Sequence, residues 1–151
     1  SGMCCFWKTT QINMVFTDDQ LPKNWEEFKL MADFIKSTPV DNLRFPDDQA
    51  FYNNYLDLVD KDTRLKILFN TFDGKSRIIL RTSFPYSNLI KFLPFVSHYC
   101  LWSRDGEIKP SEVDQEIKSK FPQKDYFWFE NDPIVKSIPE VWHCHIFVKE
   151  K

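Results

Sequence analysis

Two of the chain's three histidines, His143 and His145, stand two residues apart in the segment "IPEVWHCHIFVK". Side chains two apart on a β-strand point to the same face of its sheet, so a strand here presents both imidazoles together. The third histidine, His98, lies in "VSHYCLWS", a second segment with strand character. If the two strands share a sheet and their faces match, all three histidines converge. Imidazole suits acid–base chemistry near neutral pH, so the pattern predicts a histidine site.

A phenylalanine-proline segment, a strand histidine and a last strand with alternating histidines are similar in order to the nucleotide hydrolases and transferases of the histidine-triad superfamily. The resemblance implies a phosphohydrolase or nucleotidyltransferase. One imidazole would attack an α-phosphorus, and a second would orient it or protonate the leaving group. His145 is then the predicted nucleophile, with His143 and His98 beside it. The chain departs from a full triad, because Val141 or Phe147 stands where a third alternating histidine belongs.

A metal centre is the second interpretation of the same residues. Cα atoms at i and i+2 of a strand are about 6.6 Å apart, a gap that two imidazoles can close around one ion. His143 and His145 would supply two ligands and His98 a third, leaving one position open for water. Glu130 or Glu140 would add a carboxylate, although neither has characteristic ligand spacing. The sequence identifies no cofactor, and a divalent metal ion is an option that it does not favour.

A ligand-binding module without catalysis is the third interpretation. Aromatic residues make up 17% of the chain, enough to wall a pocket as well as fill a core. The candidates for stacking on a sugar or a base are Tyr86, Trp102, Trp128 and Phe129. Polar contacts would come from Arg81, Asn131, Lys136 and Ser137. The plainer interpretation is that the aromatics and histidines are structural, that Arg81 forms a surface ion pair, and that Lys136 lies in a solvated turn.

The rest of the chain supplies the elements that must position these residues. Apolar spacings of three and four predict helices over 21–36 and 47–61, and Pro110-Ser111 begins a short helix over 110–121. Strand patterns follow at 64–72, 77–84, 96–103, 126–131 and 140–149, with Asp73-Gly74 as a hairpin turn between the first two. We therefore predict an α+β fold, with a mainly antiparallel sheet of about five strands and the N-terminal helices packed on one face.

The 151 residues are expected to form a single domain. Ser1-Gly2 is typical of an expression-tag remnant, and residues 3–18 are expected to be poorly ordered. A net charge of -2 with scattered basic residues argues against a nucleic-acid partner. No membrane span or secretory signal is found, so we expect a cytoplasmic or nuclear protein that is not secreted. In such a compartment all four cysteines would be reduced: Cys4, Cys5, Cys100 and Cys144.

Several segments together resemble one protein family. They are "RTSFPY", "SHYCLWS", "YFWFEND" and "VKSIPEVWHCHIFV", and the earlier "VDNLRFPDDQAFYNNYLDLV" resembles the helical segment of the same family. This is the N-acetylglucosamine-induced protein family, a domain of unknown function with fungal and bacterial members, and the resemblance spans residues 20 to 149. Its name suggests a link to amino-sugar metabolism. One departure is Thr82-Ser83, where the family tends to carry Asn-Asp, so an acid–base role of that carboxylate is not available here.

The residues and the resemblance together predict a small-molecule pocket for a phosphorylated or sugar-nucleotide-like ligand, in a hydrolase or a transferase. The alternatives are a non-catalytic ligand-binding or regulatory module and a histidine-ligated metal protein. The predicted site is formed by His98, His143 and His145, walled by Tyr86, Trp102 and Trp128, and edged by Arg81 and Asn131.

Overall fold

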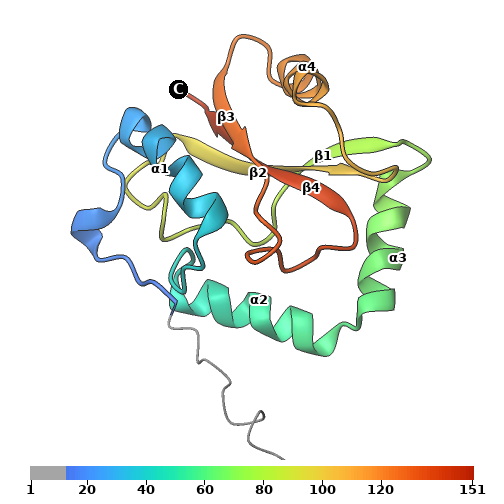
Figure 1. Ribbon diagram of the computed structural model, residues 1–151, viewed down its shortest axis with the longest axis horizontal. Helices are drawn as coiled ribbons and strands as arrows, with labels where there is room; N and C mark the ends of the chain where they lie inside the picture. The colour runs from blue at the N-terminus through green and yellow to red at the C-terminus, as the bar shows by residue number, and fades with distance from the viewer. Residues whose placement is uncertain (1–12) are drawn as a thin grey trace, which may run out of the picture.

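A four-stranded antiparallel sheet forms the centre of the molecule (Figure 1). The computed structural model describes residues 13–151, so the predictions about Ser1-Gly2 and Cys4-Cys5 lie outside the described residues. The strands are β1 (Arg77–Arg81), β2 (Val96–Ser103), β3 (Asp125–Phe129) and β4 (Trp142–Lys149). Their order across the sheet is β1-β2-β4-β3, and every neighbouring pair is antiparallel. The two histidine-bearing strands, β2 and β4, are therefore the two central strands.

Four α-helices surround the sheet: α1 (Trp25–Ser37), α2 (Pro46–Leu58), α3 (Lys61–Phe72) and α4 (Pro110–Lys120). A short 3-10 helix, η2, spans Asp18–Gln20. Asn24 caps α1, since its side chain accepts a hydrogen bond from the backbone N–H of Glu27 at 2.9 Å. The α+β class and the mainly antiparallel sheet are thus confirmed.

Residues 64–72 are where the predicted fold was wrong. They belong to α3 and not to a strand, so the sheet has four strands instead of about five. The helix begins at a cap that the prediction overlooked, because the Asp60 carboxylate accepts a hydrogen bond from the backbone N–H of Thr63 at 2.8 Å. Ile67 and Phe69 gave the segment its strand-like alternation, yet they are 50% and 45% exposed on the helix surface.

The predicted hairpin turn at Asp73-Gly74 is instead the end of α3. Both residues have positive φ angles, 50° and 77°. A two-residue hairpin turn and a left-handed helix C-cap both need positive φ, so the same dipeptide suits either structure. Here the backbone N–H of Asp73 donates to the Asn70 carbonyl at 3.1 Å, which closes the helix before β1 begins.

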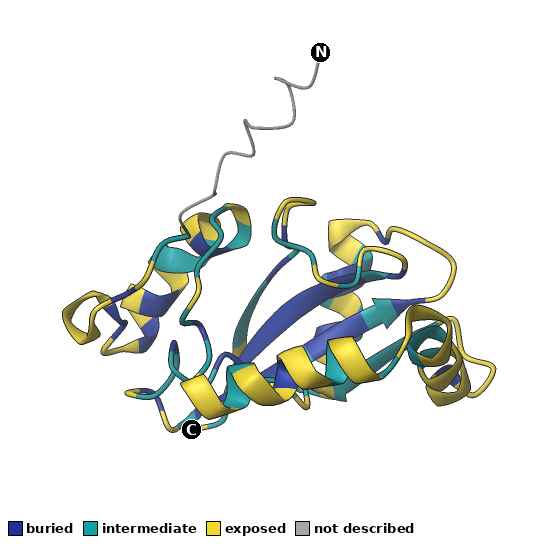
Figure 2. Cartoon of the chain, turned by 90° about the horizontal axis from the view of Figure 1, so that it is seen from below, coloured by how far each residue is buried: buried dark blue, intermediate teal, exposed yellow. Residues whose placement is uncertain are grey.

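The two faces of the sheet are covered by different helices. On one face, the Phe28 ring of α1 lies 4.8 Å from each of the Phe127 and Phe147 rings, and α2 and α3 lie on the same side. On the other face, Val113 and Ile117 of α4 pack against the sheet. Figure 2 shows the central strands buried while the helices expose their outer surfaces.

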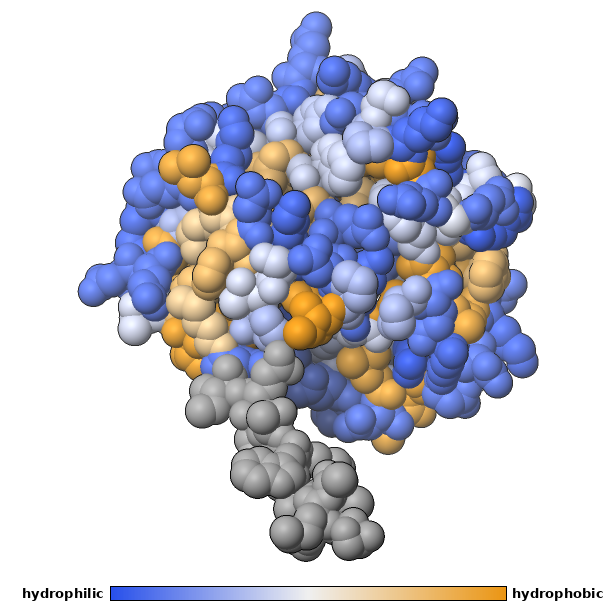
Figure 3. All heavy atoms as spheres, viewed as in Figure 1, coloured by the Kyte–Doolittle hydropathy of each residue, from blue (hydrophilic) through white to orange (hydrophobic). Residues whose placement is uncertain are grey.

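The outer surface is mostly hydrophilic on the side shown in Figure 3, with apolar side chains in separate patches. Within residues 13–151, none of the helices combines the length and the apolar character that a membrane crossing requires.

Candidate acid–base site

The register of β2 against β4 places the three histidines on one face of the sheet. Cys100 lies opposite His145, and Trp102 lies opposite His143. Residues directly opposite on antiparallel strands share a face, and His98 is two residues before Cys100, so it shares that face as well. All three imidazoles are buried, with exposed fractions of 2% for His98 and 8% for the other two.

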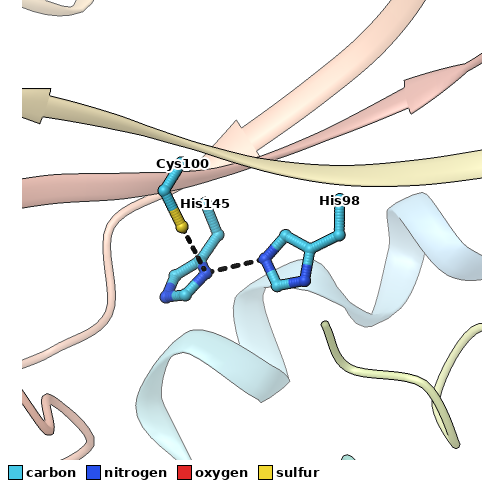
Figure 4. Close-up of side chains that lie close together, drawn as sticks. All are labelled: His98, Cys100 and His145. Atoms are coloured by element: carbon cyan, nitrogen blue, oxygen red, sulfur yellow. Dashed lines mark hydrogen bonds between the residues drawn. The ribbon is translucent and has the colours of Figure 1, made fainter. Parts of the chain in front are cut away.

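His98 and His145 contact each other directly (Figure 4). Nε2 of His98 lies 2.9 Å from Nδ1 of His145, and the Cys100 sulfur lies 3.7 Å from that same Nδ1. The other ring nitrogen of His98, Nδ1, accepts a hydrogen bond from the backbone N–H of Tyr86 at 3.2 Å. This bond comes from the loop between β1 and β2, and it decides the protonation of the whole pair.

A backbone N–H can only donate, so Nδ1 of His98 must carry a lone pair. Neutral His98 then carries its proton on Nε2 and donates it to Nδ1 of His145. Since Nδ1 of His145 accepts, neutral His145 carries its own proton on Nε2. The hydrogen bonds therefore run in one direction, from Tyr86 through His98 to His145. The last donor of this series is Nε2–H of His145.

The side chain of Asn131 accepts the last hydrogen bond of this series, which comes from His145. One atom of its side-chain amide lies 3.0 Å from Nε2 of His145 and 3.2 Å from the Tyr86 hydroxyl. Because His145 donates from Nε2, this atom must be the amide oxygen, which also accepts from the Tyr86 hydroxyl. The other amide atom is buried and has no hydrogen-bond partner in residues 13–151. With the oxygen assigned, that atom is an NH2 group left without an acceptor in the described part of the chain.

His143 has the opposite protonation. Its Nδ1 lies 3.0 Å from the carbonyl oxygen of Val141, so Nδ1 carries the proton and donates it to that oxygen. Nε2 of His143 is then left with a lone pair. The ring is held by stacking on Trp102, with the two ring centroids 4.2 Å apart and the planes 23° from parallel. The cavity wall therefore presents an acceptor at Nε2 of His143, whereas the single N–H of His145 is already donated to Asn131.

Burial keeps all three imidazoles neutral. It lowers the pKa of His98 to about 3, and the positive charge of Arg44 acts in the same direction. Burial also holds the pKa of His145 well below its usual range, with further lowering from His98, His143 and Arg44. The pKa of His143 is lowered by burial as well, against a smaller raising effect of the Val141 carbonyl.

His143 and His145, but not His98, line a cavity of about 70 Å³ between the sheet, α2 and the loops that follow α1, β1 and β3. Among the described residues that line it, Arg44 is the only arginine or lysine. The Arg44 guanidinium carbon lies 4.3 Å from the centre of the Tyr52 ring and 5.0 Å from that of Tyr86, and Nε donates to the Phe84 carbonyl at 2.9 Å. The cavity therefore combines one fixed cation at Arg44, one neutral donor at the Asn131 amide and one lone pair at His143.

A metal ion does not fit this donor set. Ligand atoms of His98, Cys100 and His145 lie within 4.8 Å of one another. Ligation through Nε2 would force the proton of His98 onto Nδ1, where it would face the N–H of Tyr86. Burial raises the pKa of the Cys100 thiol to about 12, so in the metal-free protein this sulfur is a protonated thiol.

The predicted site residues separate into three groups. Tyr86, Trp102, Asn131 and Ser137 line the histidine cavity. Arg81 lies at a neighbouring cavity beside α3, and Lys136 is occupied by an ion pair with Glu130 at 2.6 Å.

Trp128 was assigned to the wrong face. It lies opposite Ile146 in the sheet and donates from Nε1 to the Asp114 carboxylate of α4 at 3.0 Å. Neighbouring residues on a strand point to opposite faces, so Phe129 and not Trp128 points toward His145, with ring centroids 5.8 Å apart.

Arg44 and Tyr52 are the site residues that the sequence did not reveal. Both come from the chain before β1, more than forty residues away from the histidine strands in sequence. The one available signal was "NLRFPDDQAFY", whose arginine and tyrosine belong to a segment that also resembles the uncharacterised family.

No protein-family model matches the chain, and no curated protein matches it either. A solved structure described as "Crystal Structure of HTC1" is similar in fold, with a TM-score of 0.57. The alignment covers 83% of this chain and 84% of that chain at 16% sequence identity. At this identity the likeness concerns the fold alone.

Proposed function

We propose that this protein binds a small phosphorylated or sugar-nucleotide-like molecule in the histidine cavity and acts on it as a hydrolase or transferase. The observation that carries the proposal is the lone pair on Nε2 of His143 in the same cavity as the amide NH2 of Asn131, which has no acceptor in residues 13–151. A nucleophile beside a hydrogen-bond donor is the core of a group-transfer site. Arg44 adds a positive charge that suits anionic oxygens.

In this proposal Nε2 of His143 attacks the phosphorus, the bond from phosphorus to the leaving oxygen breaks, and the leaving oxygen takes a proton from water. A water molecule or an acceptor hydroxyl then displaces His143 from the phosphorus and releases its own proton to solvent, which restores the lone pair. The amide NH2 of Asn131 donates hydrogen bonds to the phosphoryl oxygens, whose negative charge grows during transfer, and His145 orients that amide through the hydrogen bond to its oxygen. His145 itself is a poor nucleophile, because its Nε2 lone pair appears only if the proton leaves. His98 is a positioning residue that fixes the tautomer of His145 without contacting the ligand.

We also propose that the protein is related to the uncharacterised N-acetylglucosamine-induced protein family. We propose in addition that it is located in the cytoplasm or the nucleus. The support for the relationship is that the cavity residues come from the segments that carry the resemblance, as Asn131, His143 and His145 do. Cys100 and Cys144 are both free thiols, which agrees with a reducing compartment.

The test is a thermal-shift screen with nucleotides, sugar nucleotides and sugar phosphates, followed by turnover assays on the compounds that bind. A ligand at 100 times its Kd should stabilise the protein by about 2.7 kcal/mol. His143→Gln keeps the shape and an acceptor but removes the nucleophile, so turnover should fall at least about 100-fold with binding retained. Lys118→Gln, on the exposed side of α4, is the matched control and should behave as the wild type.

A non-catalytic binding module is the second candidate, favoured by the small volume of the cavity, about 70 Å³, and by the burial of its histidines. In that case ligands would bind and Arg44→Gln would weaken them, while no bound compound would turn over. Retention of full turnover in His143→Gln would instead reject the proposed role of that residue.

A further inference from the structure

A second cavity, of about 200 Å³, lies on the same face of the sheet between α3 and the strands. Figure 1 shows α3 at the β1 edge of the sheet. Its walls are largely hydrocarbon and aromatic, with side chains of Leu65, Leu68, Leu80, Phe84, Trp102 and Ile138. None of the three histidines lines this cavity, and it is the larger of the two.

The two cavities adjoin. Thr82, Phe84, Cys100, Trp102 and Ile138 line both of them. Trp102 is the most informative of these residues, because one face of its ring stacks on His143 while the residue also borders the α3 cavity. A molecule held at His143 therefore has an apolar compartment directly beside it.

The size of the α3 cavity limits what it can hold. A cavity of about 150 Å³ lined by aliphatic and aromatic side chains accommodates benzene. The α3 cavity is somewhat larger, at about 200 Å³, so an aryl ring or an acyl or alkyl chain of about six to eight carbons fits it. A sugar ring is a poorer match, because its hydroxyls need polar partners that hydrocarbon walls do not provide.

Charged side chains stand around this apolar compartment. Lys61 pairs with Glu140 at 3.7 Å, and Arg64 donates to the backbone carbonyls of Leu56 and Val59. Arg81, which also lines the cavity, forms no ion pair with the residues that the structure describes. The side chains that line and surround the α3 cavity thus suit a ligand with an apolar middle and an anionic group at one end.

We propose that the α3 cavity holds an aryl or short alkyl group of the same ligand whose phosphate occupies the histidine cavity. The substrate class is then an aryl or alkyl phosphate or a phosphoric ester with one such group. This inference rests on the proposed function, since it places the anionic end at Arg44 and the amide of Asn131. The apolar end would decide which phosphorylated molecule is accepted.

Isothermal titration with a series of alkyl phosphates from two to ten carbons tests the inference, with inorganic phosphate as the head alone. Affinity should rise about fourfold for each added methylene, following the transfer free energy of a CH2 group, and stop rising near about eight carbons. Leu68→Trp fills the α3 cavity, so it should abolish the dependence on chain length while leaving the affinity for inorganic phosphate unchanged. Asn70→Trp adds the same bulk on the exposed side of α3 and should match the wild type. Circular dichroism shows that each variant is folded.

The outcomes separate this inference from the proposed function. Phosphate binding that is weakened by Arg44→Gln but unaffected by chain length would overturn the inference and leave the proposed function standing. A dependence on chain length that persists in Arg44→Gln and is lost in Arg81→Gln would put the anionic end at the outer arginine, and would overturn the inference too. Failure of every phosphate to bind would overturn both.

Discussion

The two faces of β4 are built from alternate residues of one short segment, and they differ in polarity and in hydrogen bonding. Cys144, Ile146 and Val148 are fully buried against α4 in a layer made mainly of hydrocarbon. His143 and His145, from between them, are also buried, yet they line a cavity and form a directed set of hydrogen bonds.

The difference shows where the protein accepts an energetic cost. Four of the six buried polar side chains in residues 13–151 belong to the histidine face: His98, Asn131, His143 and His145. Burying neutral polar groups is unfavourable unless each finds a partner. Two buried side-chain atoms have none within residues 13–151, one of the Asn131 amide and Nε1 of Trp142 on the α4 face, so the number of buried polar side chains is what distinguishes the two faces. A face selected for stability alone would look like the α4 face, so the histidine face is where we expect function.

Ile146→Ala should produce the largest change in stability. The side chain is fully buried, so the substitution should lower the free energy of unfolding by about 2–5 kcal/mol through lost burial and a new cavity. Urea unfolding at neutral pH measures this. The ligand affinity of the folded fraction should remain as in the wild type, and a lost histidine site would show that the two faces are not independent.

Asp114→Ala should break the polar contact that joins α4 to β3. The Asp114 carboxylate accepts hydrogen bonds from the Tyr126 hydroxyl and from Nε1 of Trp128, each at 3.0 Å. Its loss should cost about 2 kcal/mol of unfolding free energy. The pKa of Tyr126, which burial and then Asp114 raise to about 12, should fall toward its ordinary value in an ultraviolet titration. An unchanged tyrosine titration would contradict this account of α4.

The stability of the wild type should decrease as the pH falls below about 6.5. His98 has a folded-state pKa of about 3, so between these two values the unfolded chain binds a proton that the folded chain does not. Each such histidine therefore removes about 1.4 kcal/mol of unfolding free energy per pH unit below about 6.5, and nothing above it. His98→Gln keeps a donor toward His145 but cannot titrate, so its urea midpoints at pH values of about 7.5 and 5.5, on either side of the ordinary histidine pKa, should lie closer together. If the two urea midpoints were equally far apart in the wild type and in the variant, the account of His98 as a buried, neutral imidazole would be wrong.

Nitrogen chemical shifts give the smallest but most direct signal. At a pH of about 7.5, two-bond proton–nitrogen correlation spectra should show His98 and His145 protonated on Nε2 and His143 protonated on Nδ1. The reverse tautomer for His98 would mean that the Tyr86 N–H does not donate to it, and that the hydrogen bonds do not run from Tyr86 to His145. The His143→Gln variant supplies the assignment of the third ring.

Periodicity and capping residues alone allowed much of the architecture to be predicted. The alternation in β2 and β4 separated the histidines from Cys144 and Ile146, because side-chain direction in a strand depends only on position. Helix α3 was missed because Leu65, Ile67 and Phe69 fit a strand period, while Leu65, Leu68 and Phe72 fit a helical one. Burial, which sequence does not report, distinguishes the two.

Only the tertiary structure determined the properties that depend on residues distant in the sequence. The face of Trp128 depends on where α4 packs, and the charge in the cavity depends on Arg44, which folding brings from before α2. The sequence alone placed the three histidine rings on one face of the sheet, because the alternation of side chains along a strand is a local property. Which nitrogen carries the proton is not a local property for His98 and His145, because the backbone N–H of Tyr86 sets it, whereas for His143 the carbonyl of Val141, two residues earlier in the same segment, sets it.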